Sequence, residues 1–323
     1  GNIFQPRNLQ GRHGGVHFNG TAAQIITGAT TFTNLVINNA LGVTANSNLS
    51  ITGNFTNTAG FNAGTTTTTF NGAVDQTITG ATAFNNLTMN NTSGSGTELT
   101  LNNDTTVNGT LNFLLGNVVT NANTLIIAAG GTVSRSSGHV FGNLRKNVAT
   151  GTNVSRTFEI GDGPDYLPVD VIFSSVTTAG NLTVSVTTTA TDHPQLATSA
   201  INPNDSVNRY WTFTRDTNLA FTDYSATFNY LDGSSPSGID DNDNAANAPD
   251  YMIQRYEVNS PSCATSGGTW KNTTLSATAP TSIQASAIGI TAIGTCSQFA
   301  IGGSNVSGIV REKEFIYTRE LFY

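Results

Sequence analysis

Charged side chains are scarce in this 323-residue chain. Lys, Arg, Asp and Glu make up 10% of the residues, against about 25% in ordinary globular proteins. Thr, Asn, Gly, Ala and Ser take their place, so hydroxyl and amide groups solvate the surface, which suits an extracellular β-protein. The net charge is −7 and the pI is near 4.9. Because no basic stripe could neutralise phosphates, we expect no nucleic-acid partner.

Long apolar runs are also missing. No stretch of 18 or more apolar residues occurs, so we expect no membrane-spanning helix. The chain has neither an initiator Met nor the apolar core of a signal peptide at Gly1. We therefore expect a processed or trimmed form of a secreted, extracellular or cell-surface protein.

Cysteine is limited to Cys263 and Cys296, which lie in one late segment. Because the rest of the composition is typical of a secreted protein, we predict a disulfide between them. Closing a loop of that size stabilises a fold by roughly 3 to 4 kcal/mol on the chain-entropy model. The alternative is two free, buried thiols.

Groups that could carry catalysis are few and scattered. Between Val16 and Val148 the acids are Asp75, Glu98 and Asp104, at least six residues apart, whereas paired-carboxylate hydrolysis needs two carboxyl groups within about 5 to 10 Å. None of the four histidines has metal-site spacing: they are His13, His17, His139 and His193. We predict no enzymatic activity and no cofactor, apart from the calcium site considered below.

A repeat dominates the first part of the chain. The segment FNGTAAQIITGATTFTNLVINN at residues 18–39 returns 52 residues later as FNGAVDQTITGATAFNNLTMNN at residues 70–91, with 14 of 22 positions identical. The shared polar residues are amides and include no acid, base or nucleophile: Gln24/Gln76, Asn34/Asn86 and Asn38/Asn90. Repeats at such a period predict a stacked architecture, and this one indicates a structural wall rather than an active site.

Residues 16–148 read as short β-strands broken by Gly and Asn. Runs such as Leu49–Ile51 and Leu99–Leu101 alternate with period two, and helix signals are nearly absent. We predict a parallel β-helix, in which each rung buries its apolar side on its neighbours. A sandwich of hairpins is the alternative. Residues 1–15 are expected to form an arm or a cap on the first rung.

Residues 149–303 have longer alternating strands, for example Leu167–Phe173 and Leu182–Thr188. Seven or more such strands separated by turn signals predict a β-sandwich or jelly roll. Trp211 and Phe213 are expected in its core. The fold class is therefore all-β, with a solenoid followed by a sandwich.

Residues 304–323 differ in composition from the rest. The stretch REKEFIYTRELFY at residues 311–323 lacks Gly and Asn and holds three of the six Glu residues. A charged, apolar-spiked terminus frays unless something holds it. We predict that it is a strand donated to another copy of the chain, through Phe315, Tyr317, Leu321 and Tyr323. The alternative is that it folds back on its own chain.

One acidic cluster, DDNDNAANAPD at residues 240–250, has the oxygen-rich character that Ca²⁺ prefers. It does not fit the EF-hand loop, because Ala245 and Tyr251 stand where Gly and a bidentate Glu are needed. Two interpretations follow for this cluster: a looser calcium site on Asp240, Asp241 and Asp243, or a solvated turn.

The two repeats, together with LNNDTTVNGTLNF, TFEIGDGPDYLPVDVIF and VNRYWTFT, resemble the repetitive surface proteins of bacteria that use the type IX secretion system. The resemblance covers residues 18–302 and implies β-helix rungs followed by a β-sandwich in an adhesin-like extracellular protein. The tail after Gly303 departs from the usual sorting domain. O-glycosylation in these bacteria favours Asp-Ser/Thr-apolar triplets, which implicates Ser206 and, loosely, Thr105.

Three functions follow as hypotheses. The first is a self-assembling subunit of an extracellular filament, fibre or sheath, a homopolymer built by strand exchange through the tail. The second is a monomeric adhesin or carbohydrate-binding module that recognises surface glycans through Tyr166, Tyr210 or Trp270. The third is a polysaccharide-degrading enzyme, which the shortage of paired acids disfavours.

Overall fold

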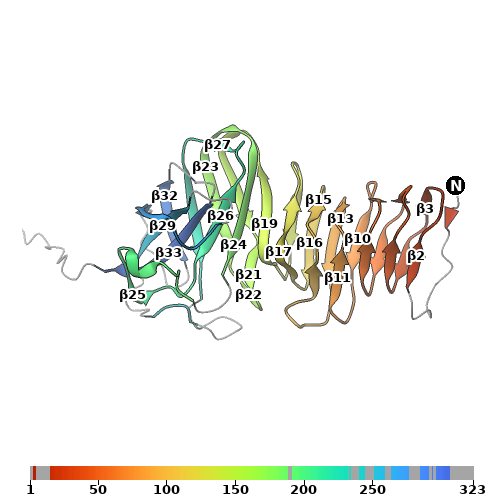
Figure 1. The fold of residues 1–323 in the computed structure, drawn as a ribbon, viewed down its shortest axis with the longest axis horizontal. Helices are drawn as coiled ribbons and strands as arrows, with labels where there is room; N and C mark the ends of the chain where they lie inside the picture. The colour runs from red at the N-terminus through yellow and green to blue at the C-terminus, as the bar shows by residue number, and fades with distance from the viewer. Residues whose placement is uncertain are drawn as a thin grey trace, which may run out of the picture.

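Short parallel strands stack into a β-solenoid of about seven turns. The computed structural model describes residues 3–4, 15–187, 191–231, 233, 240–243, 251–258, 263–275, 284–290, 293 and 296–305. The solenoid strands follow one another along the long axis of the molecule, and longer antiparallel strands occupy the opposite end (Figure 1). The prediction of an all-β chain with an N-terminal parallel β-helix is confirmed.

Three parallel sheets form the walls of the solenoid. The first holds β1 (Ile3–Phe4), β3 (Gln24–Ile26), β6 (Val43–Ala45) and β9 (Phe61–Asn62). The second, which we call the Thr-rich sheet, has the order β18 (Thr132–Arg135), β16 (Thr110–Leu115), β13 (Asn86–Asn90), β10 (Thr67–Phe70), β7 (Leu49–Ile51) and β4 (Thr30–Phe32). The third begins with β2 (Val16–Phe18), β5 (Leu35–Ile37), β8 (Phe55–Asn57), β11 (Gln76–Thr79) and β14 (Leu99–Leu101). Strand β14 pairs with β17 (Val118–Ile127), which pairs with β19 (Val140–Val148). Strand β12 (Thr82–Phe84) pairs with β15 (Thr105–Val107), which also pairs with β17.

The period-two alternation of the sequence places one side chain of each pair inside the solenoid. In the Thr-rich sheet the inward positions include Ile51, Phe70, Met89 and Phe113, which are in register from strand to strand and almost fully buried. Phe84, in β12, packs against both Phe55 and Phe70, with ring centroids 5.5 and 6.2 Å apart. Tilted and edge-to-face ring pairs of this kind fill the interior in the first turns of the solenoid.

The amides shared by the two repeats hold the turns of the solenoid. Asn39 Nδ2 donates hydrogen bonds to Ala22 O and to Gln24 Oε1, both at 2.8 Å. Asn91, 52 residues later, repeats this arrangement with Val74 O at 2.8 Å and Gln76 Oε1 at 2.9 Å. The repeated amides therefore satisfy backbone groups that the turns would leave unpaired. This is the structural role that the sequence indicates.

Strand β19 connects the solenoid to the antiparallel part. It pairs in parallel with β17 on one side, from Val140 to Lys146. On the other side its residues Leu144 to Val148 pair antiparallel with β24 (Gly180–Val186). From β24 the sheet continues through β26 (Trp211–Arg215), β33 (Cys296–Ser304), β29 (Met252–Val258) and β30 (Thr269–Asn272).

A second antiparallel sheet runs through β20 (Gly151–Phe158), β23 (Val169–Thr178), β28 (Tyr224–Asn229), β32 (Gln284–Ile290) and β31 (Thr274–Leu275). Aromatic rings from the two antiparallel sheets meet. Phe228 of β28 lies 5.1 Å from Trp211 and 5.0 Å from Phe299, centroid to centroid. Trp211 and Phe213 are fully buried, as expected. Phe18 in the first turn and Ile301 in β33 belong to one continuous apolar cluster.

We predict that Gln76→Ala destabilises the protein by about 3 kcal/mol, measured by urea unfolding. Gln76 is fully buried; its Oε1 accepts from Gly72 N and its Nε2 donates to Ile51 O, both at 2.9 Å. Its loss leaves several buried polar groups unpaired, at roughly 1 to 3 kcal/mol each. The matched control is Gln24→Ala in the first repeat, where the side chain is only half-buried. Equal costs at the two positions would contradict this assignment.

Candidate functional site

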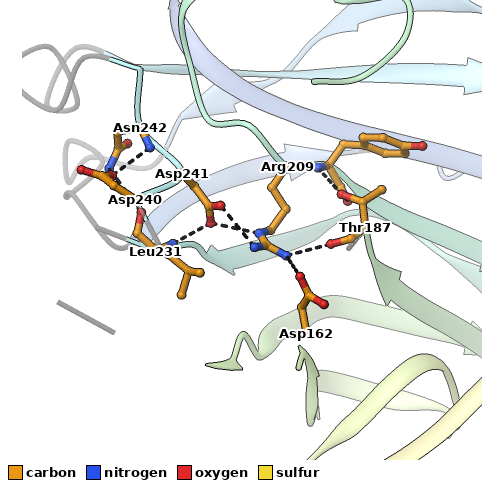
Figure 2. Close-up of polar contacts among 8 residues, drawn as sticks. Asp162, Thr187, Arg209, Leu231, Asp240, Asp241 and Asn242 are labelled. Carbon is orange, nitrogen blue, oxygen red and sulfur yellow. Dashed lines mark hydrogen bonds and ion pairs between the residues drawn. The ribbon is translucent and has the colours of Figure 1, made fainter. Parts of the chain in front are cut away.

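A buried polar cluster centres on Arg209, which is 1% exposed. Its guanidinium donates through Nε to Asp241 Oδ2 at 2.9 Å and through Nη1 to Asp162 Oδ2 at 3.1 Å. Nη1 also donates to Thr187 O at 2.7 Å (Figure 2). Asp162 ends β21 (Ile160–Asp162), which pairs with β19, so the cluster ties the junction to the antiparallel part. Because the buried charge of Arg209 is fully paired with carboxylates and a carbonyl, we assign this cluster a structural role.

The three aspartates of the predicted calcium site are not brought together. Asp241 is fully buried and faces Arg209, whereas Asp240 turns away and accepts from Asn242 N at 2.9 Å (Figure 2). Asp243 accepts from Asn208 Nδ2 at 2.7 Å. Among the described residues, no three His, Cys, Asp or Glu side chains are grouped to hold a metal. The acidic cluster is visible in the sequence, but its partner Arg209, 32 residues earlier, is not. The guanidinium of Arg209 pairs with the carboxylate of Asp241, which is therefore not available to a metal ion.

We predict that Asp241→Asn destabilises the protein by about 3 to 5 kcal/mol, because it leaves the buried charge of Arg209 incompletely compensated. Asp240→Asn, at an exposed neighbouring carboxylate, is the control and is expected to change stability by less than about 0.5 kcal/mol. Thermal unfolding with and without Ca²⁺ checks both. If Ca²⁺ stabilised the wild-type protein and both substitutions abolished this effect, the calcium-site hypothesis would be supported instead.

The two predicted glycosylation sites, Ser206 and Thr105, are inaccessible to solvent in the folded chain. Ser206 is fully buried and its Oγ donates to Asp192 Oδ1 at 2.8 Å. Thr105 is fully buried in β15, in register with Thr82 and Leu125. A three-residue motif carries no information about burial, because burial depends on the strands and loops that pack around the motif.

The aromatic residues proposed to stack on sugars are engaged within the protein. Tyr210 and Trp270 each lie 4.9 Å from the ring of His193, centroid to centroid. Trp270 Nε1 also donates to Gln195 O at 3.1 Å. His193 itself is 2% exposed and Nε2 lies 2.9 Å from Gln298 Oε1. Burial lowers the pKa of His193, so this aromatic cluster surrounds a neutral imidazole.

Tyr166 lies at the junction beside His139, with ring centroids 6.3 Å apart, and the guanidinium of Arg135 covers its ring at 3.5 Å. His139 is 2% exposed. Burial, reinforced by the charge of Arg135, lowers the pKa of His139 to about 4. The imidazole is therefore neutral in the folded protein at pH 5 to 7.

We predict that His139 makes stability fall between pH 6.5 and pH 4. Its pKa is lowered on folding, so in this window the unfolded chain binds a proton that the folded chain does not. The loss is about 3 kcal/mol across the window. Urea unfolding at several pH values checks this against His139→Gln, in which the other titrating groups are unchanged. The same pH dependence in both proteins would contradict the prediction.

The acids of the solenoid also have separate structural partners. Glu98 is buried and accepts from Asn117 N at 2.8 Å, and Asp104 accepts from Thr124 N at 2.8 Å. Asp75 accepts from the hydroxyl of Ser93 at 2.7 Å, and hydroxyl hydrogen bonds lower its pKa. Each carboxylate thus accepts hydrogen bonds from backbone or hydroxyl donors of the solenoid.

A polar pocket of about 430 Å³ at the junction was not expected from the sequence. It lies between β18, an edge of the Thr-rich sheet, and β20, an edge of the second antiparallel sheet. Lys146 takes an inward position of β19 between Leu144 and Val148, and its Nζ pairs with Glu159 Oε2 at 2.5 Å. Burial lowers the pKa of Lys146, and the charge of Glu159 opposes this. The sequence contained one signal for this pocket: Lys146 stands at a position of an alternating strand where an apolar residue is expected.

Cys263 and Cys296 form the predicted disulfide, with Cα atoms 5.4 Å apart. The predicted subunit contacts Phe315, Tyr317, Leu321 and Tyr323 lie outside the described residues, as does His13. In the described part of the chain, no helix is long and apolar enough to cross a membrane.

Comparison of the chain with family models, curated proteins and solved structures finds no match in any of the three. The function is therefore inferred from the geometry described above.

Proposed function

We propose that this protein is a structural, self-assembling subunit of an extracellular filament, fibre or sheath. The observation that carries the proposal is a strand edge at one end of the solenoid. In the described structure β4 is the last strand of the Thr-rich sheet and pairs with β7 alone. β33, which leads toward the tail, lies at the other end of the molecule (Figure 1).

Among the described residues, the edge of β4 that faces away from β7 pairs with no strand, and it is suited to accept one. Thr30 N donates to Asn48 O at 3.4 Å, and Phe32 O accepts from Thr52 N at 2.9 Å. Backbone groups alternate along a strand, so the N–H and C=O of Thr31 point away from β7. Such an unpaired edge is a template for strand addition.

The tail sequence supplies a matching donor. Residues 311–323 place Phe315, Tyr317, Leu321 and Tyr323 at alternating positions, as an added strand requires. Addition of one copy's tail to the first turn of the next is a head-to-tail contact that does not close on itself, and such contacts generate filaments.

The contacts that the polar side chains make within the chain support the same proposal. The solenoid acids, the buried histidines and Arg209 all contact other parts of the chain. The apolar cluster continues from the first turn to β33. These features favour a load-bearing scaffold.

We predict that deleting residues 311–323, or substituting Thr31→Pro, each leaves soluble monomers. Proline removes the outward N–H of β4 while leaving the groups that face β7. Thr31→Val keeps the N–H and the β-branched shape, so it should polymerise normally. Electron microscopy and sedimentation provide the measurement, with circular dichroism to confirm folding.

Mixing the two defective proteins gives the sharper result. The deletion variant retains the acceptor edge and the Thr31→Pro variant retains the donor tail, so the mixture should form dimers and no filaments. Undiminished polymerisation of the deletion variant would reject tail donation. Assembly by Thr31→Pro at the wild-type rate would reject the β4 edge as acceptor.

A further inference from the structure

The outer face of the Thr-rich sheet is a regular array of uncharged hydrogen-bonding groups. Register pairs Thr69 with Thr88 and Thr88 with Asn112, and the row continues in both directions along the solenoid. The full row is Thr31, Ser50, Thr69, Thr88, Asn112 and Ser134. Neighbouring strands of a sheet lie about 4.8 Å apart, so this face repeats a polar group at that interval along the long axis.

A shallow groove of about 360 Å³ lies on this face. It crosses β10, β13, β16 and β18, and its lining contains no charged and no aromatic residue: Thr67, Asn86, Thr88, Thr110, Asn112 and Ser134. The groove follows the solenoid axis, so an elongated occupant fits it better than a compact one.

Part of this array has no partner within the described protein. Asn86 Oδ1 accepts from Thr110 N at 2.8 Å, and the hydroxyls of Thr110 and Thr132 lie 3.1 Å apart. By contrast, among the described residues no hydrogen bond engages the side chains of Thr67, Thr69, Thr88, Asn112 or Ser134. These groups can exchange water for a ligand without breaking an internal contact.

We propose that this groove binds an uncharged polysaccharide, extended along the solenoid axis. Each hydroxyl and amide offers both donors and acceptors, which matches the hydroxyls of a neutral sugar, and each Thr methyl can contact its C–H groups. A charged polymer would lose hydration without meeting a counter-charge in the groove. The side chain of Thr has restricted rotation about χ1, so the array is ordered before binding and loses little entropy.

The repeat favours a polymer over a single sugar. One hydrogen bond exchanged with water contributes little affinity, but contacts repeated along a linked chain of sugars add together. The groove lining lies on β10, β13, β16 and β18 and includes no residue of β4, so the proposed binding does not require self-assembly.

The test is affinity electrophoresis of the full chain through gels that contain soluble galactomannan, xyloglucan or dextran, or the acidic polymer alginate. We expect at least one neutral polymer to retard the wild-type protein and alginate not to do so. Thr69→Val/Thr88→Val removes two adjacent hydroxyls at constant shape and should weaken binding about tenfold.

The matched control is Thr77→Val/Thr100→Val. Thr77 and Thr100 are also outward, half-buried and paired across adjacent strands, but they belong to the third sheet. This double variant should bind as the wild type does. No retardation by any of the neutral polymers, equal retardation by alginate, or equal loss in the two double variants would each overturn the proposal.

Discussion

The pairing of β19 on both of its edges is the constraint on which the rest of the structure depends. Its parallel side extends the solenoid through β17, and its antiparallel side begins the sheet that ends at β30. The same strand directs Leu144 and Val148 into the shared core. A solenoid turn needs a neighbour to cover its apolar face, and here the antiparallel part supplies that cover. The two parts therefore stabilise each other through one strand.

Much of the fold could be predicted, because a repeated pattern of apolar and amide residues indicates repeated structural units. The recurrence of Phe18 and Phe32 as Phe70 and Phe84 identifies positions that face the interior. The two copies lie on different walls, since Phe18 belongs to β2 of the third sheet and Phe70 to β10 of the Thr-rich sheet. The alternation in β23 and β24 likewise predicts which residues are buried. The tail prediction remains a prediction, since residues 306–323 lie outside the described structure.

The candidate sites were harder to predict, because each depends on contacts between distant residues. Asp241 belongs to an acidic run in the sequence, but Arg209 determines its environment. Ser206 fits a surface motif, but Asp192 and the surrounding strands bury it. Trp270 has the character of a sugar-binding residue, yet it packs on His193. A single sequence gives residue types and spacings, whereas these outcomes depend on which turns and loops meet.

Both functions proposed above lie on edges and surfaces, because the interior polar groups contact one another. We infer that β19 joins the solenoid and the antiparallel sheets into one cooperative unit, and native-state amide hydrogen exchange tests this most directly. We predict that amides of β17, β19, β24 and β26 exchange slowly and share one opening free energy, which equals the free energy of global unfolding. Slow exchange in the antiparallel strands, with the solenoid amides opening separately at a much lower free energy, would contradict it.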